Sequence, residues 1–406
     1  MRDDGTGNGT LACLLGRDLR GIYASIFLLG LAIGAESSVL ALFLRSASLS
    51  SEKIGSLATA YAAGGVAISA LLGRVVGRVG AIRTLAVALV ALGLAIAVLP
   101  VAAHSTTGLY AGRVVEGAAL VAVWVGYEAA LFSRAKPAHR ATVSTLYAMV
   151  LALGYVIGPL VARALFPFGV AALPFWFAAA VTIGNGLSIT AFSRERGGAS
   201  MAPAADEPSA DASFASLAWK VKTTGFGMFA AGYLKASLIL FLPLYLVDHR
   251  GLLTEEPPLV LSAYAAGSLL FTHFAGRLGD RHGHLVLMGM LSAIGGLALF
   301  GVLFVDAVTA MCLISAVAGA TLGAISPLGM ALQASIAKRT EYGRAMSLSN
   351  GLYAAGTLAG PFVTGVLYAQ APRMAMIQVA AMWLVFTAFC IVFAADDPAR
   401  HPMKDA

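Results

Sequence analysis

Residues 110–134, YAGRVVEGAALVAVWVGYEAALFSR, are long and apolar enough to span a membrane, yet they include ionisable residues well inside the segment. A helix turns 100° per residue, which gathers one set of its residues into an arc of roughly 120°. This set is Arg113, Glu116, Gly117, Leu120, Trp124, Tyr127 and Glu128. An ionisable group in hydrocarbon costs about 2.5 kcal/mol or more, so it normally faces a bundle interior or a water-filled cavity. The segment therefore predicts a helix that forms one wall of a polar pathway.

The composition of the whole chain agrees with a membrane location. Of its 406 residues, 59% are hydrophobic and only 12% are charged, and the mean hydropathy is +0.83. Soluble domains contain about 25% charged residues, so a soluble chain of this composition would expose an aggregating surface. The net charge of +7 does not indicate a nucleic-acid partner, because the basic residues are not gathered in one patch. Cys13, Cys312 and Cys390 have no metal-binding or redox spacing.

Apolar runs of about 20 residues recur along the chain, which is the length that a hydrocarbon layer of about 30 Å requires. Each must be a helix, because unpaired backbone groups cannot face lipid. We predict twelve spans, at about 21–44, 54–73, 82–103, 107–132, 142–166, 171–192, 221–247, 259–277, 284–305, 308–335, 345–369 and 375–394.

The distribution of basic residues gives the orientation of these spans. Twenty of the 27 Lys and Arg residues fall in the two termini and the even-numbered loops. Because cytoplasmic loops are enriched in Lys and Arg, both termini are predicted in the cytoplasm. We therefore expect a multi-pass protein of the cell (inner or plasma) membrane.

A polar segment divides the chain into two halves. Residues 193–216, rich in Ala, Ser, Pro and Gly, cannot form a core and predict a flexible cytoplasmic linker. The predicted domains are an N-terminal six-helix half at 1–192, the linker at 193–218 and a C-terminal six-helix half at 219–406.

The two halves contain matching segments in the same order. AYAAG at 60–64 recurs at 263–267, and the loop at 73–80 aligns with 276–283, each at an offset of 203. Gly154-x-x-x-Gly158-Pro159 is matched by Gly356-x-x-x-Gly360-Pro361 at an offset of 202. Three ordered matches indicate duplication, which is how many secondary transporters are built.

These segments resemble the major facilitator superfamily, over essentially the whole chain. The loop signature of that family, G-x-x-x-D-[RK]-x-G, is intact as Gly276, Asp280, Arg281 and Gly283. After the second span the copy that begins at Gly73 and Arg74 has Gly77 where the Asp is expected. The resemblance implies that Asp280 helps to latch the cytoplasmic side, and that the first half lacks this part of the latch.

Two further signatures resemble those of the family. Arg113-x-x-Glu116-Gly117 is similar to the fourth-helix pattern R-x-x-Q/E-G, whose Arg is commonly linked to proton coupling. The Gly154, Gly158 and Pro159 segment is similar to the fifth-helix signature of antiporters, with its trailing Gly-Gly replaced by Ala162 and Arg163. The implied fold is an all-α integral membrane protein of twelve transmembrane helices in two pseudo-symmetric six-helix bundles. From the residues themselves, the Gly-x-x-x-Gly-Pro segments, including Gly360 and Pro361, predict close helix packing and bending.

Candidate proton-coupling residues follow from depth in the membrane. Glu36 lies about eight residues from the outer end of the first span, and Arg113 lies about seven residues into the fourth, which starts from the same side. The two side chains should therefore meet, either as a carboxylate that exchanges a proton beside a guanidinium or as a permanent charge pair. Glu116, one turn from Arg113, is either a local partner of that guanidinium or part of the proton site.

Candidate substrate residues lie deeper and in the second half. Trp124 and Tyr127 either stack on a flat or cationic substrate or simply pack. Glu128 either extends to the interface, pairs with Arg134 or holds a proton. Lys235, near the middle of the seventh span, either binds an anionic substrate or pairs with Glu36 in one conformation. Weaker cavity candidates are Tyr61, Tyr264 and Gln333.

These features favour a secondary transporter that works by alternating access and uses a proton gradient, with no cofactor and no bound metal. No Walker lysine loop, H-E-x-x-H or G-x-S-x-G motif occurs, so an enzyme is not expected. We expect proton-coupled efflux of small amphipathic compounds, of the drug:proton antiport type, by a functional monomer in the lipid bilayer. The alternatives are proton-coupled uptake of a small metabolite and a non-transporting membrane sensor on the same fold.

Overall fold

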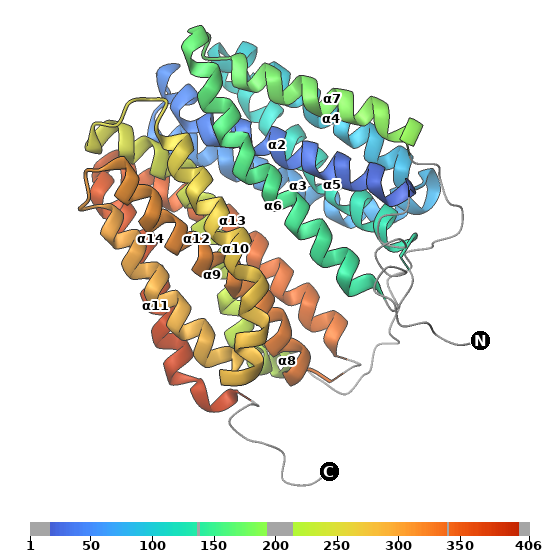
Figure 1. The fold of residues 1–406 in the computed structure, drawn as a ribbon, viewed down its shortest axis with the longest axis vertical. Coiled ribbons are helices and arrows are strands. Elements are labelled where there is room, and N and C mark those ends of the chain that lie inside the picture. The colour runs from blue at the N-terminus through green and yellow to red at the C-terminus, as the bar shows by residue number, and fades with distance from the viewer. Residues whose placement is uncertain (1–16, 136–138, 193–213, 339–340, 398–406) are drawn as a thin grey trace. The chain divides into compact units, whose positions relative to one another are not determined.

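The structure is a computed structural model that describes residues 17–135, 139–192, 214–338 and 341–397 (Figure 1). Within these residues the chain is helical and contains no strand. Eleven helices are long and apolar enough to cross a membrane, and the bent helix α10 makes a twelfth. They are α2 (Arg17–Ser46), α3 (Ser51–Val79), α4 (Ala81–Val101), α5 (Thr106–Phe132), α6 (Arg140–Leu165), α7 (Leu173–Phe192), α9 (Lys222–Arg250), α10 (Pro257–His282), α11 (His284–Val302), α12 (Val308–Ile336), α13 (Tyr342–Gln370) and α14 (Pro372–Val392).

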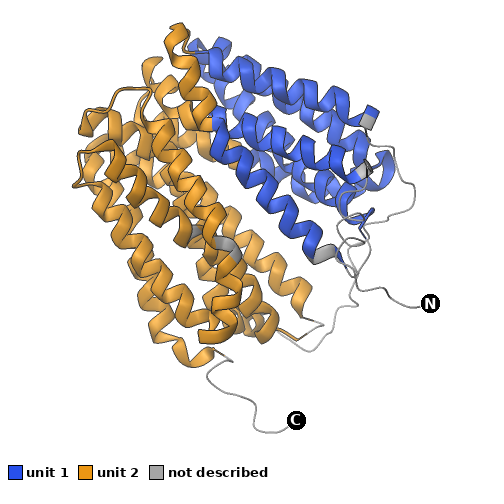
Figure 2. Cartoon of the chain, in the orientation of Figure 1, with its two compact units in different colours: residues 1–36, 63–158, 172–202 blue, residues 37–62, 159–171, 203–406 orange. Residues whose placement is uncertain are grey.

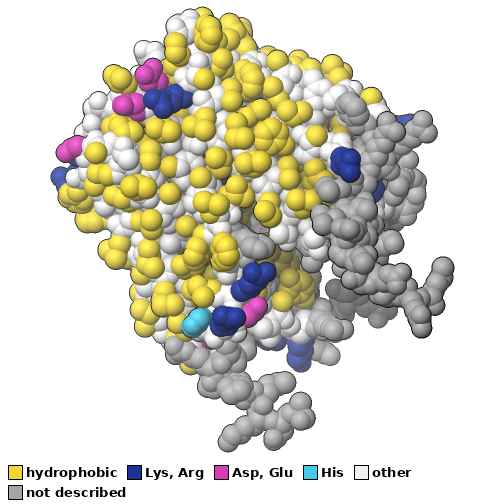
Figure 3. Space-filling view, in the orientation of Figure 1, with side chains coloured by type: hydrophobic (Ala, Val, Ile, Leu, Met, Phe, Trp, Pro, Cys, Tyr) yellow, Lys and Arg dark blue, Asp and Glu magenta, His cyan; other side chains and the backbone are white. Residues whose placement is uncertain are grey.

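The predicted all-helical membrane fold is confirmed, and each predicted span corresponds to one of these helices. The face in Figure 3 is covered mainly by hydrophobic side chains, with the charged ones lying toward its margins. Large apolar side chains such as Val87 (68% exposed) and Leu270 (70% exposed) are open to the surroundings, as lipid contact requires. Most of the predicted linker, residues 193–213, lies outside the described residues.

The chain forms two compact units (Figure 2). Unit 1 comprises residues 1–36, 63–158 and 172–202, and unit 2 comprises 37–62, 159–171 and 203–406. Their boundaries run through α2, α3 and α6, so the last part of α2, the first part of α3 and the end of α6 belong to unit 2. The predicted domains, an N-terminal half at 1–192 and a C-terminal half at 219–406, were inferred from the sequence repeat. That division stays a prediction.

Glycines allow the same helix contact to form once in each half. In unit 1, a Cβ atom at Gly64 of α3 would lie 2.0 Å from the carbonyl oxygen of Val114 in α5. In unit 2, a Cβ atom at Gly267 of α10 would lie 1.8 Å from the carbonyl oxygen of Ala316 in α12. Both glycines belong to the repeated AYAAG segment. Only glycine permits backbones to approach this closely.

The Gly-x-x-x-Gly-Pro segments also make matching contacts. A Cβ at Gly158 of α6 would lie 2.5 Å from the Leu31 carbonyl oxygen in α2, and one at Gly360 of α13 would lie 2.4 Å from the Tyr233 carbonyl oxygen in α9. Pro159 and Pro361 lie inside their helices. These segments therefore lie where their helices approach a neighbouring helix closely.

The turns after α3 and α10 have the same backbone shape. Gly80 has φ 96° and Gly283 has φ 89°, and each glycine precedes the next helix of its half. Residues with a Cβ rarely adopt this conformation, which explains why the last position of the loop signature is a glycine. Neither glycine has a side chain to cap the helix that follows.

Polar contacts hold the short helix α8 near the start of α13 in unit 2. The short helix α8 (Phe214–Lys220) leads into α9, and Lys220 Nζ lies 2.7 Å from Glu341 Oε2. This hydrogen bond lowers the pKa of the Glu341 carboxyl from its ordinary value. Lys222 contacts the rings of Trp219 and Phe393, with its Nζ 4.8 and 4.5 Å from their centroids.

Asp397 caps α11 from a distant part of the chain, and we expect its removal to destabilise the protein. Its Oδ2 accepts from the Leu285 N–H at 2.9 Å, and the residue is 1% exposed. Asp397→Ala should lower the free energy of unfolding by about 1 kcal/mol, as loss of a helix cap does. Thermal unfolding of the purified protein in detergent measures this. Asp396→Ala is the control: its carboxylate pairs with Lys222 but its side chain is 41% exposed, and exposed pairs contribute about 0–1 kcal/mol. Equal destabilisation by both variants would contradict a capping role for Asp397.

Candidate functional site

Helix α5 carries the candidate site and begins at a local cap. The Ser105 side chain accepts from the Gly108 N–H at 3.2 Å. Along the helix, Arg113, Glu116 and Tyr127 of the predicted polar arc are buried, whereas Val115 on the other side is 52% exposed. These three residues of the arc therefore face the interior of unit 1, whereas Glu128 of the same arc is exposed.

Three charged side chains meet in the interior of unit 1. Arg113 Nη1 donates to both carboxylate oxygens of Glu116 at 2.8 Å, and it lies 3.4 Å from Glu36 Oε1 of α2. The three side chains are between 3% and 6% exposed. The predicted meeting of Glu36 and Arg113 is thus observed, and Glu116 is the nearer partner of the guanidinium.

The composition of this charge cluster (Glu36, Arg113, Glu116) has a chemical consequence. Two carboxylates face one guanidinium, so the cluster carries an excess negative charge when both carboxylates are ionised. An uncompensated charge in a buried site is costly, and a group that can neutralise itself tends to do so. A single proton on one carboxylate would remove the excess charge. The cluster therefore has the charge balance of a site that holds and releases one proton.

Tyr127 occupies a different place from the one expected for a cavity residue. Its side chain is 0% exposed, and its hydroxyl hydrogen-bonds to Ser25 Oγ of α2 and accepts from Asn185 Nδ2 of α7 at 3.3 Å. Asn185 Nδ2 also donates to the Ser25 carbonyl oxygen at 2.8 Å. The prediction that Tyr127 lines the substrate cavity is therefore corrected: its ring fills the core between α2, α5 and α7. Asn185 was not singled out, although an amide inside an apolar span was a signal.

Trp124 and Glu128 lie on the open part of α5. Trp124 is half-buried and Glu128 is exposed. Arg134, the partner considered for Glu128, instead donates to the Ala130 carbonyl oxygen at 2.8 Å. Tyr147 of α6, which was not predicted, lies close enough to Glu128 for the two to interact electrostatically.

The candidates in unit 2 divide into exposed and packed residues. Lys235 of α9 is exposed and Tyr61 of α3 is half-buried. Tyr264 is 8% exposed, and Gln333 of α12 is 1% exposed and accepts from Ser349 Oγ of α13 at 2.9 Å. Tyr264 and Gln333 therefore belong to the packed interior of unit 2 in this structure, and not to an open cavity as predicted.

The loop-signature residues lie near the ends of α3 and α10. Asp280 is 74% exposed, and its Oδ1 lies 3.3 Å from His284 Nε2. Arg281 is exposed at the end of α10, and Arg74 is exposed on α3. A Cβ at Gly73 or Gly276 would meet no atom within 4 Å, so neither glycine is required by packing.

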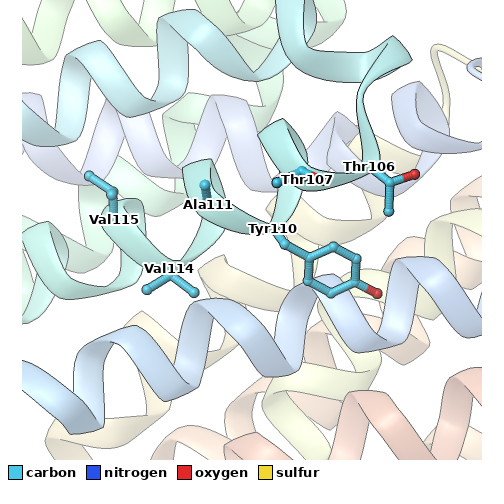
Figure 4. Close-up of a pocket in the computed structure, with 6 residues that line it drawn as sticks. All are labelled: Thr106, Thr107, Tyr110, Ala111, Val114 and Val115. Carbon is cyan, nitrogen blue, oxygen red and sulfur yellow. The ribbon is translucent and has the colours of Figure 1, made fainter.

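A groove runs along the first three turns of α5 (Figure 4). It measures about 570 Å³ and is lined by Thr106, Thr107, Tyr110, Ala111, Val114 and Val115. In Figure 4, Tyr110 and Val114 project from the same side of this helix, and Val115 lies apart from them. None of the six lining residues is charged at neutral pH, so the groove does not contain the polar candidates.

Comparison with known proteins identifies the family. The family model described as Major Facilitator Superfamily matches residues 22–253 and 224–405. The chain belongs to the major facilitator superfamily (MFS). It is therefore a membrane transporter of the general secondary type.

Relatives and solved structures agree with this membership. Uncharacterized MFS-type transporters of Yersinia enterocolitica and Yersinia pestis are each 24% identical, over 90% of this chain and 93% of the relative. A bacterial homolog of the human lysosomal transporter Spinster, crystallised in an inward-facing and occupied conformation, has a TM-score of 0.74 at 15% identity, covering 97% of this chain and 98% of that one. The nucleoside transporter NupG has a TM-score of 0.71 at 14% identity, covering 93% and 97%. At such identities the solved structures show the fold alone.

Proposed function

We propose that this MFS transporter is proton-coupled and exports small amphipathic compounds by alternating access. The observation that carries the proposal is the buried charge cluster of Glu36, Arg113 and Glu116, with its two carboxylates and one guanidinium. A proton bound in one conformation and released in another links the proton gradient to the conformational equilibrium, because the gradient acts through the difference in proton affinity.

The direction of transport and the membrane location of the protein are part of the same proposal. The similarity of the Gly154, Gly158 and Pro159 segment to the antiporter signature favours export over uptake. The enrichment of basic residues in the even-numbered loops supports an inner-membrane protein with both termini in the cytoplasm. The proton gradient supplies the energy without a cofactor, and the working form is a monomer in the bilayer.

Neutralising Glu36 is expected to uncouple transport from protons. Glu36→Gln keeps the size of the side chain and a hydrogen-bond acceptor for Arg113, but it cannot exchange a proton. In proteoliposomes with an imposed pH gradient, ethidium accumulation should fall to the rate of protein-free liposomes. Counterflow of ethidium without a gradient should persist, because substrate exchange does not require proton release.

The control for this experiment is Glu52→Gln. Glu52 is exposed in the first turn of α3 and should leave gradient-driven transport unchanged. Gradient-driven accumulation at the normal rate in Glu36→Gln would overturn the assignment of Glu36 to proton coupling. Proton-coupled uptake of a small metabolite is the second candidate, and the orientation of the pH gradient that drives accumulation separates it from export.

A further inference from the structure

The short helix α8 places an indole ring and a lysine at one end of unit 2. Its Leu217 is 2% exposed and packs with Ala345 of α13, so this side of α8 faces the core. Trp219 lies on the opposite side, because a helix turns 100° per residue, and it is 66% exposed. Lys220 extends toward the start of α13, where its Nζ pairs with Glu341. Helix α8 is thus held to unit 2 while its indole ring stays open to the surroundings.

Basic side chains outnumber acidic ones where α8 meets the start of α13. Glu341 Oε2 lies 2.7 Å from Lys220 Nζ and accepts from the Lys338 N–H at 3.2 Å. Both lysines also act on this carboxylate through their charge. Arg344 is exposed in the first turn of α13, and Lys338 is exposed just before that helix. The basic cluster (Lys220, Lys338 and Arg344, together with Glu341) therefore has three positive charges against one negative charge.

The basic cluster lies at the level where membrane spans end. Lys338 comes two residues after α12, which ends at Ile336, and Arg344 comes two residues after the start of α13 at Tyr342. Both helices are long and apolar enough to cross a membrane, so the hydrocarbon layer gives way to lipid headgroups near these residues. Basic residues at this depth attract anionic lipids.

Apolar side chains adjoin the basic cluster at the same level. The rings of Trp219 and Phe393 are in edge contact, with their centroids 6.1 Å apart. Lys222 lies over both rings and pairs with Asp396, which fixes the position of the indole. Val392, at the end of α14, is 72% exposed. Indole rings are enriched at membrane interfaces, since they combine an apolar body with a polar N–H.

We propose that the basic cluster and Trp219 bind an anionic phospholipid. Its phosphodiester would accept hydrogen bonds from the basic side chains, and charge-assisted bonds of this kind are the stronger ones. The upper part of its acyl chains would contact the indole, which a soluble phosphate compound cannot do. In the orientation proposed above, the site lies in the cytoplasmic leaflet. The proposal does not rest on proton coupling, because the site lies in unit 2 and the charge cluster lies in unit 1.

Native mass spectrometry of the full-length protein in detergent tests this proposal by titration with lipid. Dioleoyl phosphatidylglycerol and dioleoyl phosphatidylcholine are matched probes, because they share their chains and differ in headgroup charge. We expect the first phosphatidylglycerol to bind at least about tenfold more tightly than the first phosphatidylcholine. Glycerol 3-phosphate at the same concentration should not displace the lipid. Equal affinity for the two lipids, or displacement by glycerol 3-phosphate, would overturn the proposal.

Paired substitutions assign the selectivity to the basic cluster. Lys338→Gln with Arg344→Gln removes two exposed cations, and at about fivefold for each cation it should weaken phosphatidylglycerol binding by about tenfold or more. Binding of phosphatidylcholine should not change. Lys338→Arg with Arg344→Lys keeps both charges and should bind like the wild type. The control is Arg78→Gln with Arg83→Gln, which removes two exposed arginines of unit 1.

The outcome of these substitutions decides whether the cluster is the site. Thermal unfolding shows which variants are folded, and Lys338→Gln alone, with a loss of about fivefold, provides the test if the paired variant is not. The cluster is not the site if the folded paired variant keeps the wild-type affinity for phosphatidylglycerol. An equal loss in the control pair would show that general surface charge, and not this cluster, attracts the lipid.

Substitution of Trp219 separates the contact with the chains from the contact with the headgroup. Trp219→Ala should weaken the binding of both lipids by about threefold or more, and the preference for phosphatidylglycerol should remain because the basic cluster is intact. Trp219→Phe keeps an aromatic ring and should bind like the wild type. Trp176→Ala is the control, since Trp176 of α7 is also exposed, at 46%. If Trp219→Ala and Trp176→Ala bind both lipids equally, the indole of Trp219 is not part of the site.

Discussion

Arg113→Met should unfold at a markedly lower temperature than the wild type and should not transport. Methionine keeps an unbranched apolar stem like that of arginine but leaves Glu36 and Glu116 buried without the guanidinium that contacts both. Removing one partner of a buried ion pair typically costs about 3–5 kcal/mol, because the remaining charge is uncompensated. The free energy of unfolding in detergent is the quantity to compare, together with gradient-driven ethidium flux.

A second variant distinguishes lost charge balance from lost shape. Replacing all three residues, as Arg113→Met with Glu36→Gln and Glu116→Gln, removes the buried charges together. Neutralising every member of a buried ion cluster removes the uncompensated charge that makes the loss of one partner costly. The triple variant should therefore recover most of the stability that Arg113→Met loses, while proton-coupled transport stays absent.

The matched control is an arginine at the surface of unit 2. Arg45 pairs with Asp248 at 3.7 Å, but its side chain is 47% exposed. Such pairs contribute about 0–1 kcal/mol, so Arg45→Met should change stability little. If Arg113→Met were as stable as Arg45→Met, the charge cluster would not be a buried ion site, and its proposed proton exchange would lose its physical basis.

The sequence predicted the helices well because the bilayer constrains their length and composition. Each predicted span corresponds to a helix, but several helices are longer than the span. Helix α3 continues to Val79, and α13 begins at Tyr342. The polar ends of these helices were not predicted, because hydropathy identifies only the part of a helix that lies in the hydrocarbon layer.

The candidate site was predicted in part. Counting residues from the helix ends placed Glu36 and Arg113 at one depth, and their side chains do meet. Helical periodicity also showed which side of α5 is polar. Periodicity does not show what packs against that side, which is why Tyr127 was expected at a cavity and is buried against Asn185.

Contacts between segments of unit 2 that are far apart in the chain could not be predicted from the sequence. Thr59 Oγ1 of α3 donates to the Leu358 carbonyl oxygen of α13 at 3.0 Å, across 299 positions of sequence. A Cβ at Gly55 would lie 2.3 Å from the Pro361 carbonyl oxygen. Periodicity describes each helix by itself, and these contacts depend on which helices lie side by side. The assignment of the first part of α3 to unit 2 was therefore not predictable from its residues.

Gly64→Ala should destabilise the protein although alanine is the better helix former. The added Cβ would lie 2.0 Å from the Val114 carbonyl oxygen and 2.8 Å from its carbonyl carbon. Both atoms belong to backbone that cannot rotate away, so α3 and α5 must separate. Overpacking of this kind costs about 1–3 kcal/mol, and loss of the contacts between the two helices should add to it. The free energy of unfolding in detergent should fall by at least this amount.

The same substitution at Gly73, nine residues further along α3, provides the control. A Cβ there would meet no atom within 4 Å, so Gly73→Ala should leave stability unchanged or raise it by about 0.5–1 kcal/mol, through the smaller entropy of the unfolded chain. Gly267→Ala should repeat the effect of Gly64→Ala in unit 2, because its Cβ would lie 1.8 Å from the Ala316 carbonyl oxygen. If Gly64→Ala and Gly73→Ala have the same stability, the close approach of α3 and α5 does not exist in the folded protein. If Gly64→Ala is destabilised and Gly267→Ala is not, the two units do not share the repeated contact that their common AYAAG segment predicts.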